Sequence, residues 1–167
     1  MAKRTLSRLF LSLALPAAVL AAPAQAAPDL ERGRYLAEIM DCGGCHTRGV
    51  MLGKPDMALF LAGSEVGFHL PGLGIVYPPN LTPDAETGLG TWSEDDIIRA
   101  VRTGERPDGR ILAPIMPWRS YAALTDEDSR DLAAYLKSLP PVTWREEPQM
   151  VGEGQKAPGP FLTVAMP

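Results

Sequence analysis

The chain has 167 residues, 46% of them hydrophobic and 22% charged, and carries a net charge of −4 at pH 7. Such a length fits one domain behind a targeting segment. The acidic balance argues against nucleic acid or an anionic membrane as a partner. Aromatic residues make up only 7%, whereas there are 16 glycines and 17 prolines. We therefore expect a small side-chain core for this length, with room for a bound apolar group.

Residues 1–26 have the pattern of a secretory signal peptide. The n-region holds three basic residues, Lys3, Arg4 and Arg8. The apolar run "LFLSLALPAAVLAA" follows, and Ala24 and Ala26 take the −3 and −1 positions of a small-residue cleavage site. The run is shorter than the ~20 residues that cross a bilayer. We expect cleavage near Ala26, export to the periplasm and no membrane span in the mature chain. Removal of three of the 16 basic residues leaves 13 against 20 acidic ones, a net charge of −7.

The first predicted element is a helix over residues 29–41, "DLERGRYLAEIMD". Asp29 is a suitable N-cap, and the apolar residues recur close to the 3.6-residue helical period. Gly33 falls on that apolar face, where glycine is about 1 kcal/mol less favourable than alanine. A glycine at this position predicts the close approach of a bulky neighbour.

Residues 47–91 are predicted to be irregular, because Gly and Pro recur and no alternation of strand length is present. An irregular segment of this length is expected to be functional or to wrap a bound group. Two helices follow, over 93–103 and 125–139, each with an N-cap, an acidic first turn and an apolar stripe. Residues 143–167 are predicted to be an extended tail, ordered only where it lies on the domain or on a partner.

The only two cysteines stand in "DCGGCHTRG", a Cys-x-x-Cys-His motif. A disulfide between Cys42 and Cys45 would close a very short loop and stabilise little. A redox dithiol of the thioredoxin type needs a βαβ context, which is lacking. A zinc site needs four ligands, and His46 with the distant His69 would have to complete the set.

Covalent haem c is the reading that this pattern favours. Two thiols three residues apart can add to the two vinyl groups of one porphyrin, and His46 is then placed under the ring to bind iron. Gly43 and Gly44 allow a tight turn of the backbone. Export agrees, since bacteria attach this cofactor outside the cytoplasm. One motif, with Cys42 and Cys45 as its thiols, predicts one haem.

The sixth iron ligand is predicted to be Met116. It lies in "LAPIMPWRS" between Pro114 and Pro117, which stiffen a loop and remove competing N–H donors. It follows His46 by 70 residues, enough for the chain to reach the other face of a haem. His69 remains an alternative. The other candidate methionines are less suitably placed along the chain: Met40, Met51, Met57, Met150 and Met166.

The motifs "NLTPD", "TGLG", "WSEDD", "PDGR", "MPW" and "DLAAYLKSLPP" accompany Cys-x-x-Cys-His. Over roughly residues 30–142 the sequence resembles a class I cytochrome c, and more narrowly the cytochrome c domains of bacterial alcohol, aldehyde and gluconate dehydrogenase complexes. The resemblance implies an all-α fold around one haem in a domain spanning 27–142. It also implies that the first helix crosses the last at Gly33 and Tyr135.

The resemblance implies Cys42 and Cys45 as thioether anchors, with His46 proximal and Met116 distal. Such ligation fills all six iron positions and predicts an electron carrier rather than an enzyme. A dehydrogenase would be the donor, and an oxidase or another cytochrome of the respiratory chain the acceptor. Those dehydrogenase cytochromes often carry three haem domains, so one motif favours a small carrier or a one-haem subunit. The alternative is an open distal site that binds a small ligand or reduces peroxide.

Residues 67–91 are expected to wrap the propionate edge of the haem. Four residues are candidate hydrogen-bond donors to the propionates: Tyr77, Asn80, Trp92 and Arg119. Pro78 or Pro79 is expected to offer a carbonyl to the second nitrogen of His46, which would fix the orientation of its ring.

Overall fold

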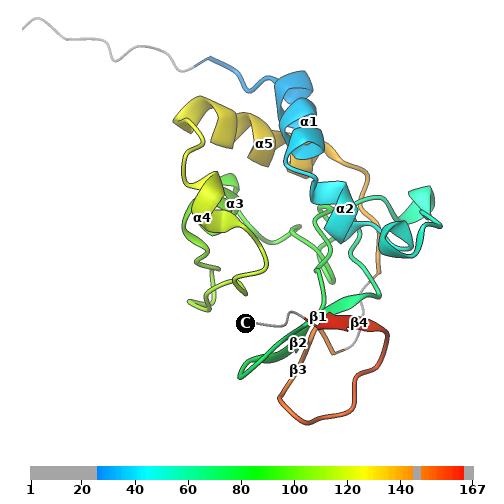
Figure 1. Cartoon of the computed structure of the whole chain (residues 1–167). Coiled ribbons are helices and arrows are strands. Elements are labelled where there is room, and N and C mark those ends of the chain that lie inside the picture. Colours follow the sequence, from blue (N-terminus) through cyan, green and yellow to red (C-terminus); the bar gives the residue numbers. More distant parts are fainter. Residues whose placement is uncertain (1–25, 145–147, 164–167) are drawn as a thin grey trace, which may run out of the picture.

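The computed structural model describes residues 26–144 and 148–163 (Figure 1). Apart from Ala26, the predicted signal peptide lies outside them. The described elements are, in chain order, α1 (Leu30–Ile39), α2 (Cys42–His46), η1 (Val50–Leu52), η2 (Met57–Leu59), β1 (Gly67–Leu70), β2 (Gly74–Val76), α3 (Glu94–Thr103), α4 (Trp118–Tyr121), α5 (Asp126–Ser138), β3 (Met150–Val151) and β4 (Phe161–Thr163). Within these ranges, no helix combines the length and the apolar character needed to cross a membrane.

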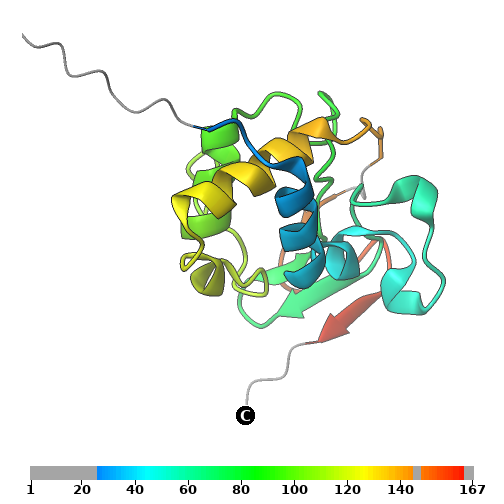
Figure 2. The same ribbon diagram turned by 90° about the horizontal axis from the view of Figure 1, so that it is seen from above.

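Helices α1 and α5 cross at Gly33, as predicted (Figure 2). A Cβ atom built on Gly33 would overlap the carbonyl oxygen of Asp131 and would lie 2.6 Å from the Cβ of Tyr135. The Asp131 carboxylate also accepts a hydrogen bond from the backbone N–H of Asp29, the N-cap of α1 (2.9 Å). The close approach of the two backbones explains the glycine on the apolar face of α1.

The remaining long helices begin as their caps predict. Ser93 and Asp96 form a capping box at α3, and the side chain of Thr125 caps α5. Both helices turn apolar faces into the core shared with α1, which centres on Leu36, Leu61, Ile97, Leu132, Ala133 and Leu136. The helical frame therefore follows from local signals in the sequence.

The prediction of an all-α fold is wrong in one respect. A four-stranded sheet of order β3-β2-β1-β4 lies below the helices (Figure 1). β1 and β2 form an antiparallel hairpin inside the segment predicted to be irregular, β3 pairs antiparallel with β2, and β4 pairs parallel with β1. Strands of two to four residues are too short to show alternation, and their partners come from distant parts of the chain.

The segment predicted to be an extended tail supplies half of this sheet. Beyond α5 the chain runs back over the 60–80 region, where the Trp144 ring lies 3.0 Å from a Cβ built on Gly63 and under the guanidinium of Arg48. Val151 is buried with Ile75 and Tyr77 in a second small core. The described part of the tail is therefore packed on the domain. This agrees with the prediction that the tail is ordered where it lies on the domain.

Candidate functional site

The Cys-x-x-Cys-His motif forms the short helix α2, directly after α1. Its N-cap, Asp41, has a φ of 55°, a left-handed conformation uncommon for residues other than glycine, Asn and Asp. The Asp41 carboxylate lies where a Cβ on Gly44 would stand, so a larger residue at 44 would displace it. The chain therefore turns sharply at Asp41 and then presents both cysteines within one helical turn.

The two thiols are free in the structure, with Cys42 half-buried and Cys45 exposed. Burial raises the pKa of the Cys42 thiol to about 11, and the Asp41 carboxylate adds to the rise. Desolvation and Asp41 also raise the pKa of Cys45. A redox-active dithiol needs a lowered thiol pKa, so this environment does not fit one.

A zinc site is not assembled in the part of the chain that the structure describes. No three side chains of the His, Cys, Asp and Glu types come together there as metal ligands. His69, the alternative ligand, lies on β1 with its Nε2 3.2 Å from a carboxylate oxygen of Glu153. Its ring also meets that of Phe161 edge to face. His69 thus belongs to the sheet and to the residues that cover it.

His46 is buried, with 7% of its surface exposed, and its Nδ1 lies 2.7 Å from the carbonyl oxygen of Pro79. Because a carbonyl can only accept, Nδ1 carries the proton, and the lone pair of Nε2 is available to a metal. Burial lowers the pKa of His46 and keeps the ring neutral, with the Pro79 contact opposing this effect. Of the two prolines considered, Pro79 makes this contact, while the Pro78 carbonyl accepts from the backbone of Ser64.

Met116 is half-buried in the segment between α3 and α4. A short turn holds it, in which its N–H donates to Ala113 and its carbonyl accepts from Trp118 (3.0 and 2.8 Å). Figure 1 shows this segment curving from α4 toward the side on which α2 lies.

Helix α4 ties the Met116 segment to the cysteines. The hydroxyl of Tyr121 donates to the carbonyl oxygen of Met40, two residues before Cys42 (2.8 Å). Burial raises the pKa of Tyr121 to about 12, and Cys42, Cys45 and Asp41 contribute through their charges. The chain just after Met116 is therefore held next to the chain that carries the thiols.

Two of the residues predicted as propionate donors already have partners within the protein. The buried hydroxyl of Tyr77 donates to the carbonyl of Gly159 and accepts from its N–H, both at 3.2 Å. The amide nitrogen of Asn80 donates to Thr87 and to the carbonyls of Val142 and Trp144. These contacts give both side chains a structural role that the sequence did not indicate.

The other two predicted donors lie near the α3–α4 segment. Trp92 precedes α3 and is half-buried, and the guanidinium of Arg106 stands 5.3 Å from its ring centre. Arg119 is exposed and lies over the ring of Trp118 at 4.2 Å. The side chain of Arg119 is therefore open to solvent, and that of Trp92 only partly so.

Three buried side-chain donors have no hydrogen-bond partner among the described residues: Arg106 Nε, Trp118 Nε1 and Arg130 Nη1. Arg130 belongs to α5, whereas Arg106 and Trp118 lie on the α3–α4 side and were not predicted as site residues. Desolvation lowers the pKa of Arg106, and Arg110 adds to this effect, while a carboxylate oxygen of Asp108 at 3.5 Å from Nε opposes it. Buried donors of this kind are expected to have an acceptor. No pattern in the sequence marks the N–H groups of Arg106 and Trp118, because their burial arises only in the folded chain.

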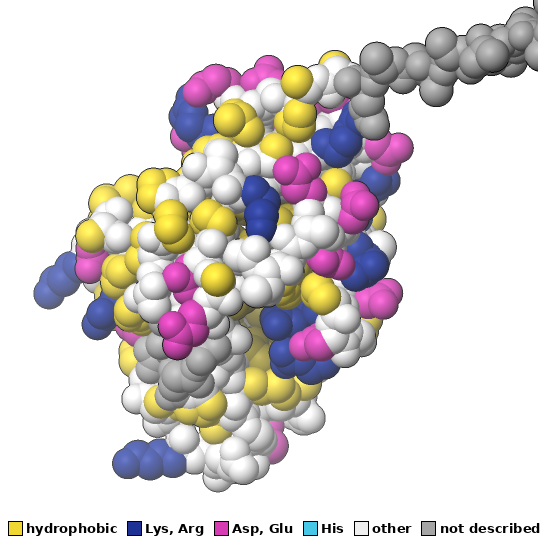
Figure 3. All heavy atoms as spheres, turned by 180° about the vertical axis from the view of Figure 1, so that it is seen from behind, with side chains coloured by type: hydrophobic (Ala, Val, Ile, Leu, Met, Phe, Trp, Pro, Cys, Tyr) yellow, Lys and Arg dark blue, Asp and Glu magenta, His cyan; other side chains and the backbone are white. Residues whose placement is uncertain are grey.

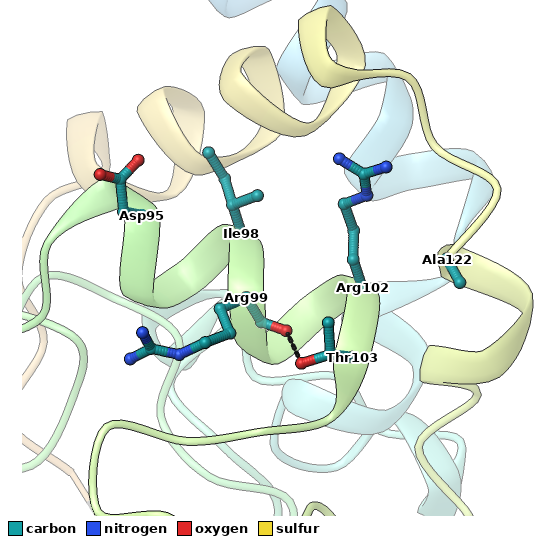
Figure 4. A pocket seen from close by; sticks show the side chains of 6 residues that line it. All are labelled: Asp95, Ile98, Arg99, Arg102, Thr103 and Ala122. Atoms are coloured by element: carbon teal, nitrogen blue, oxygen red, sulfur yellow. Dashed lines mark hydrogen bonds between the residues drawn. The ribbon is translucent and has the colours of Figure 1, made fainter.

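An open hollow of about 390 Å³ lies elsewhere, along α3 and beside the end of α4. Its residues are Asp95, Ile98, Arg99, Arg102, Thr103 and Ala122 (Figure 4). Arg102 pairs with Asp126 at 2.6 Å, and the Thr103 hydroxyl donates to the backbone carbonyl of Arg99. The hollow includes no residue of the Cys-x-x-Cys-His motif. On the face shown in Figure 3, acidic and basic side chains are interspersed rather than gathered by sign.

Residues 30–140 match the cytochrome c family. The chain is 40% identical to the fructose dehydrogenase cytochrome subunit of Gluconobacter japonicus over 65% of its own length and 21% of that protein. It is 42% identical to the gluconate 2-dehydrogenase cytochrome c subunit of Pantoea cypripedii, over 64% of its own length and 22% of that protein. A diheme cytochrome c-type protein of Cereibacter sphaeroides is 40% identical to it, over 70% of this chain and 37% of that protein.

The chain therefore belongs to the cytochrome c family, as predicted from its motifs. It spans about a fifth of the length of the fructose and gluconate dehydrogenase subunits that it matches. Family membership implies covalently attached haem c. The donors present fit that group: two adjacent thiols for the vinyl carbons, a neutral imidazole for iron, and buried N–H groups suited to propionate carboxylates.

Proposed function

We propose that this protein is an electron-transfer cytochrome that carries a single haem c. The observation that supports this most directly is the buried imidazole of His46, which lies in the same short helix as both thiols. The carbonyl of Pro79 fixes its orientation through a hydrogen bond. When bound, haem c supplies one-electron exchange between Fe(III) and Fe(II). Cys42 and Cys45 are the thioether anchors in this proposal.

His46 and Met116 are the proposed axial ligands. The hydrogen bond from Nδ1 to Pro79 fixes the tautomer of His46 and leaves the lone pair of Nε2 available to iron. The turn at Met116 and the hydrogen bond from Tyr121 to Met40, which joins the chain after Met116 to the chain before Cys42, support Met116 as the second ligand. A thioether ligand favours the reduced metal and raises the reduction potential.

The propionates are proposed to meet the α3–α4 side of the domain. Arg106 and Trp118 are the proposed donors, because each has a buried N–H group without a partner among the described residues and both lie in the region that carries Met116. Trp92, beneath Arg106, and Arg119, beside Trp118, remain proposed contacts. Tyr77 and Asn80 are no longer proposed, since their donors serve other parts of the chain.

The protein is proposed to carry electrons and not to catalyse substrate oxidation itself. The named relatives are cytochrome subunits of fructose and gluconate dehydrogenases, which supports a dehydrogenase as electron donor. The acceptor is proposed to be an oxidase or another cytochrome. The signal-peptide pattern of residues 1–26 supports a periplasmic location.

The proposal is tested by expressing the full chain in a bacterium that matures cytochromes c. Haem that stays with the purified protein through acid–acetone extraction, at one per chain, is the expected result. The oxidised protein should show the weak near-infrared band typical of His–Met ligation, and Met116→Ala should abolish it while His69→Ala retains it. Pigment that washes out, or a band that persists in Met116→Ala, would contradict the assignment.

A further inference from the structure

The carbonyl that orients His46 lies between two residues held by the C-terminal part of the chain. Pro79 accepts the hydrogen bond from His46, and Tyr77 and Asn80 stand on either side of the Pro78–Pro79 pair. Both flanking residues are almost fully buried, at 3% and 1% exposure. The position of the Pro79 carbonyl therefore depends on what holds Tyr77 and Asn80.

Tyr77 is held by the segment that contains β3 and β4. Its backbone N–H donates to the carbonyl of Gln149 (2.9 Å), and its hydroxyl exchanges two hydrogen bonds with Gly159. Its ring packs in the small core formed with Ile75 and Val151. The side chain and the main chain of Tyr77 are thus both fixed by residues more than 70 positions later.

Asn80 is held by the chain that leaves α5. Its amide nitrogen donates to the carbonyl oxygens of Val142 and Trp144, at 2.6 and 3.3 Å. Its amide oxygen accepts from the N–H and the hydroxyl of Thr82, and that hydroxyl in turn accepts from the N–H of Val142. The network leaves Asn80 little freedom to move relative to the end of α5.

We propose that residues 142–144 and 149–163 are a positioning element for His46, which acts by clamping Tyr77 and Asn80 and so fixing the Pro79 carbonyl as the acceptor of the imidazole N–H. The inference rests on the proposed function, in which His46 binds iron. The clamp residues lie beyond residues 30–140, the part that matches the family model.

The consequence for iron follows from the hydrogen bond. A well-placed acceptor on Nδ1–H makes the imidazole a stronger electron donor through Nε2. A stronger donor stabilises the oxidised metal and lowers the reduction potential. Loosening the clamp should therefore raise the potential and expose the Nδ1 proton to exchange with water.

Tyr77→Phe in the full-length holoprotein tests this step, because it removes both hydrogen bonds to Gly159 and keeps the ring. Tyr35→Phe, on the exposed face of α1, is the matched control. A second variant ends the chain after residue 147 and removes β3 and β4. For each protein the pyridine haemochrome spectrum is measured first, then the midpoint potential and, by proton NMR, the exchange rate of the His46 Nδ1 proton.

Tyr77→Phe should show a higher midpoint potential than the unchanged protein and about tenfold faster Nδ1–H exchange, with Tyr35→Phe unchanged. The truncated chain should move both quantities further in the same direction. Covalent haem in all proteins with equal potentials and exchange rates would overturn the clamp and leave the proposed function standing. Absence of covalent haem from the unchanged protein would instead overturn the proposed function. If the truncated chain is not recovered, the Tyr77→Phe measurements decide alone.

Discussion

Replacing Gly33 with alanine is expected to weaken the crossing of α1 and α5. Alanine favours the helix by about 1 kcal/mol relative to glycine. Against this gain, the new Cβ would overlap the Asp131 carbonyl oxygen and stand 2.6 Å from the Cβ of Tyr135. Overpacking of this kind usually destabilises by ~1–3 kcal/mol, and backbone atoms on the facing helix place this site at the upper end. The expected net loss is about 2 kcal/mol.

Urea unfolding of the holoprotein, followed by far-ultraviolet circular dichroism, measures this loss as a lower midpoint at an unchanged slope. Gly152→Ala is the matched control, because a Cβ there meets the side chain of Gln155 at an ordinary 3.4 Å. A Gly33→Ala protein as stable as the unchanged one, or more stable, would show that the helices separate without loss and would refute the argument.

Three further outcomes follow from single side chains. Lys137→Met should lower the free energy of unfolding by about 2 kcal/mol, seen in urea unfolding, because Lys137 Nζ donates to three backbone carbonyls within residues 89–92. The carboxylate of Asp84 accepts several hydrogen bonds, and these lower its pKa from 3.8 to about 2. The bond from the Thr143 hydroxyl has the largest effect. Because this folded-state pKa lies below the unfolded value, its stabilisation is present above about pH 4 and lost as pH falls toward 2, so urea midpoints should decline less steeply in Asp84→Asn. Arg106→Gln should lower the midpoint potential of the haem, because it removes a half-buried positive charge. Arg110→Gln removes an exposed charge and should shift the potential less in the same spectroelectrochemical titration.

The sequence by itself determined the helical frame and the chemistry of the motif. Helices α1, α3 and α5 are recognisable because their caps and apolar periods are local properties of consecutive residues. Cys42, Cys45 and His46 lie within five consecutive residues, so their spacing alone indicates haem c. The crossing at Gly33 was also predicted, because the resemblance to class I cytochromes c supplied the partner helix.

Only the tertiary structure decided what lies beneath and beside that frame. The four-stranded sheet joins residues 67–76 with residues 150–163, and strands this short carry no signal until their partners are in place. Tyr77 and Asn80 read as propionate donors in the sequence, yet Gly159, Val142 and Trp144 take up their hydrogen bonds. Pairing across 62 to 82 residues depends on the folded backbone, which no local pattern encodes. For the same reason the buried N–H groups of Arg106 and Trp118 could be found only once the chain was folded around them.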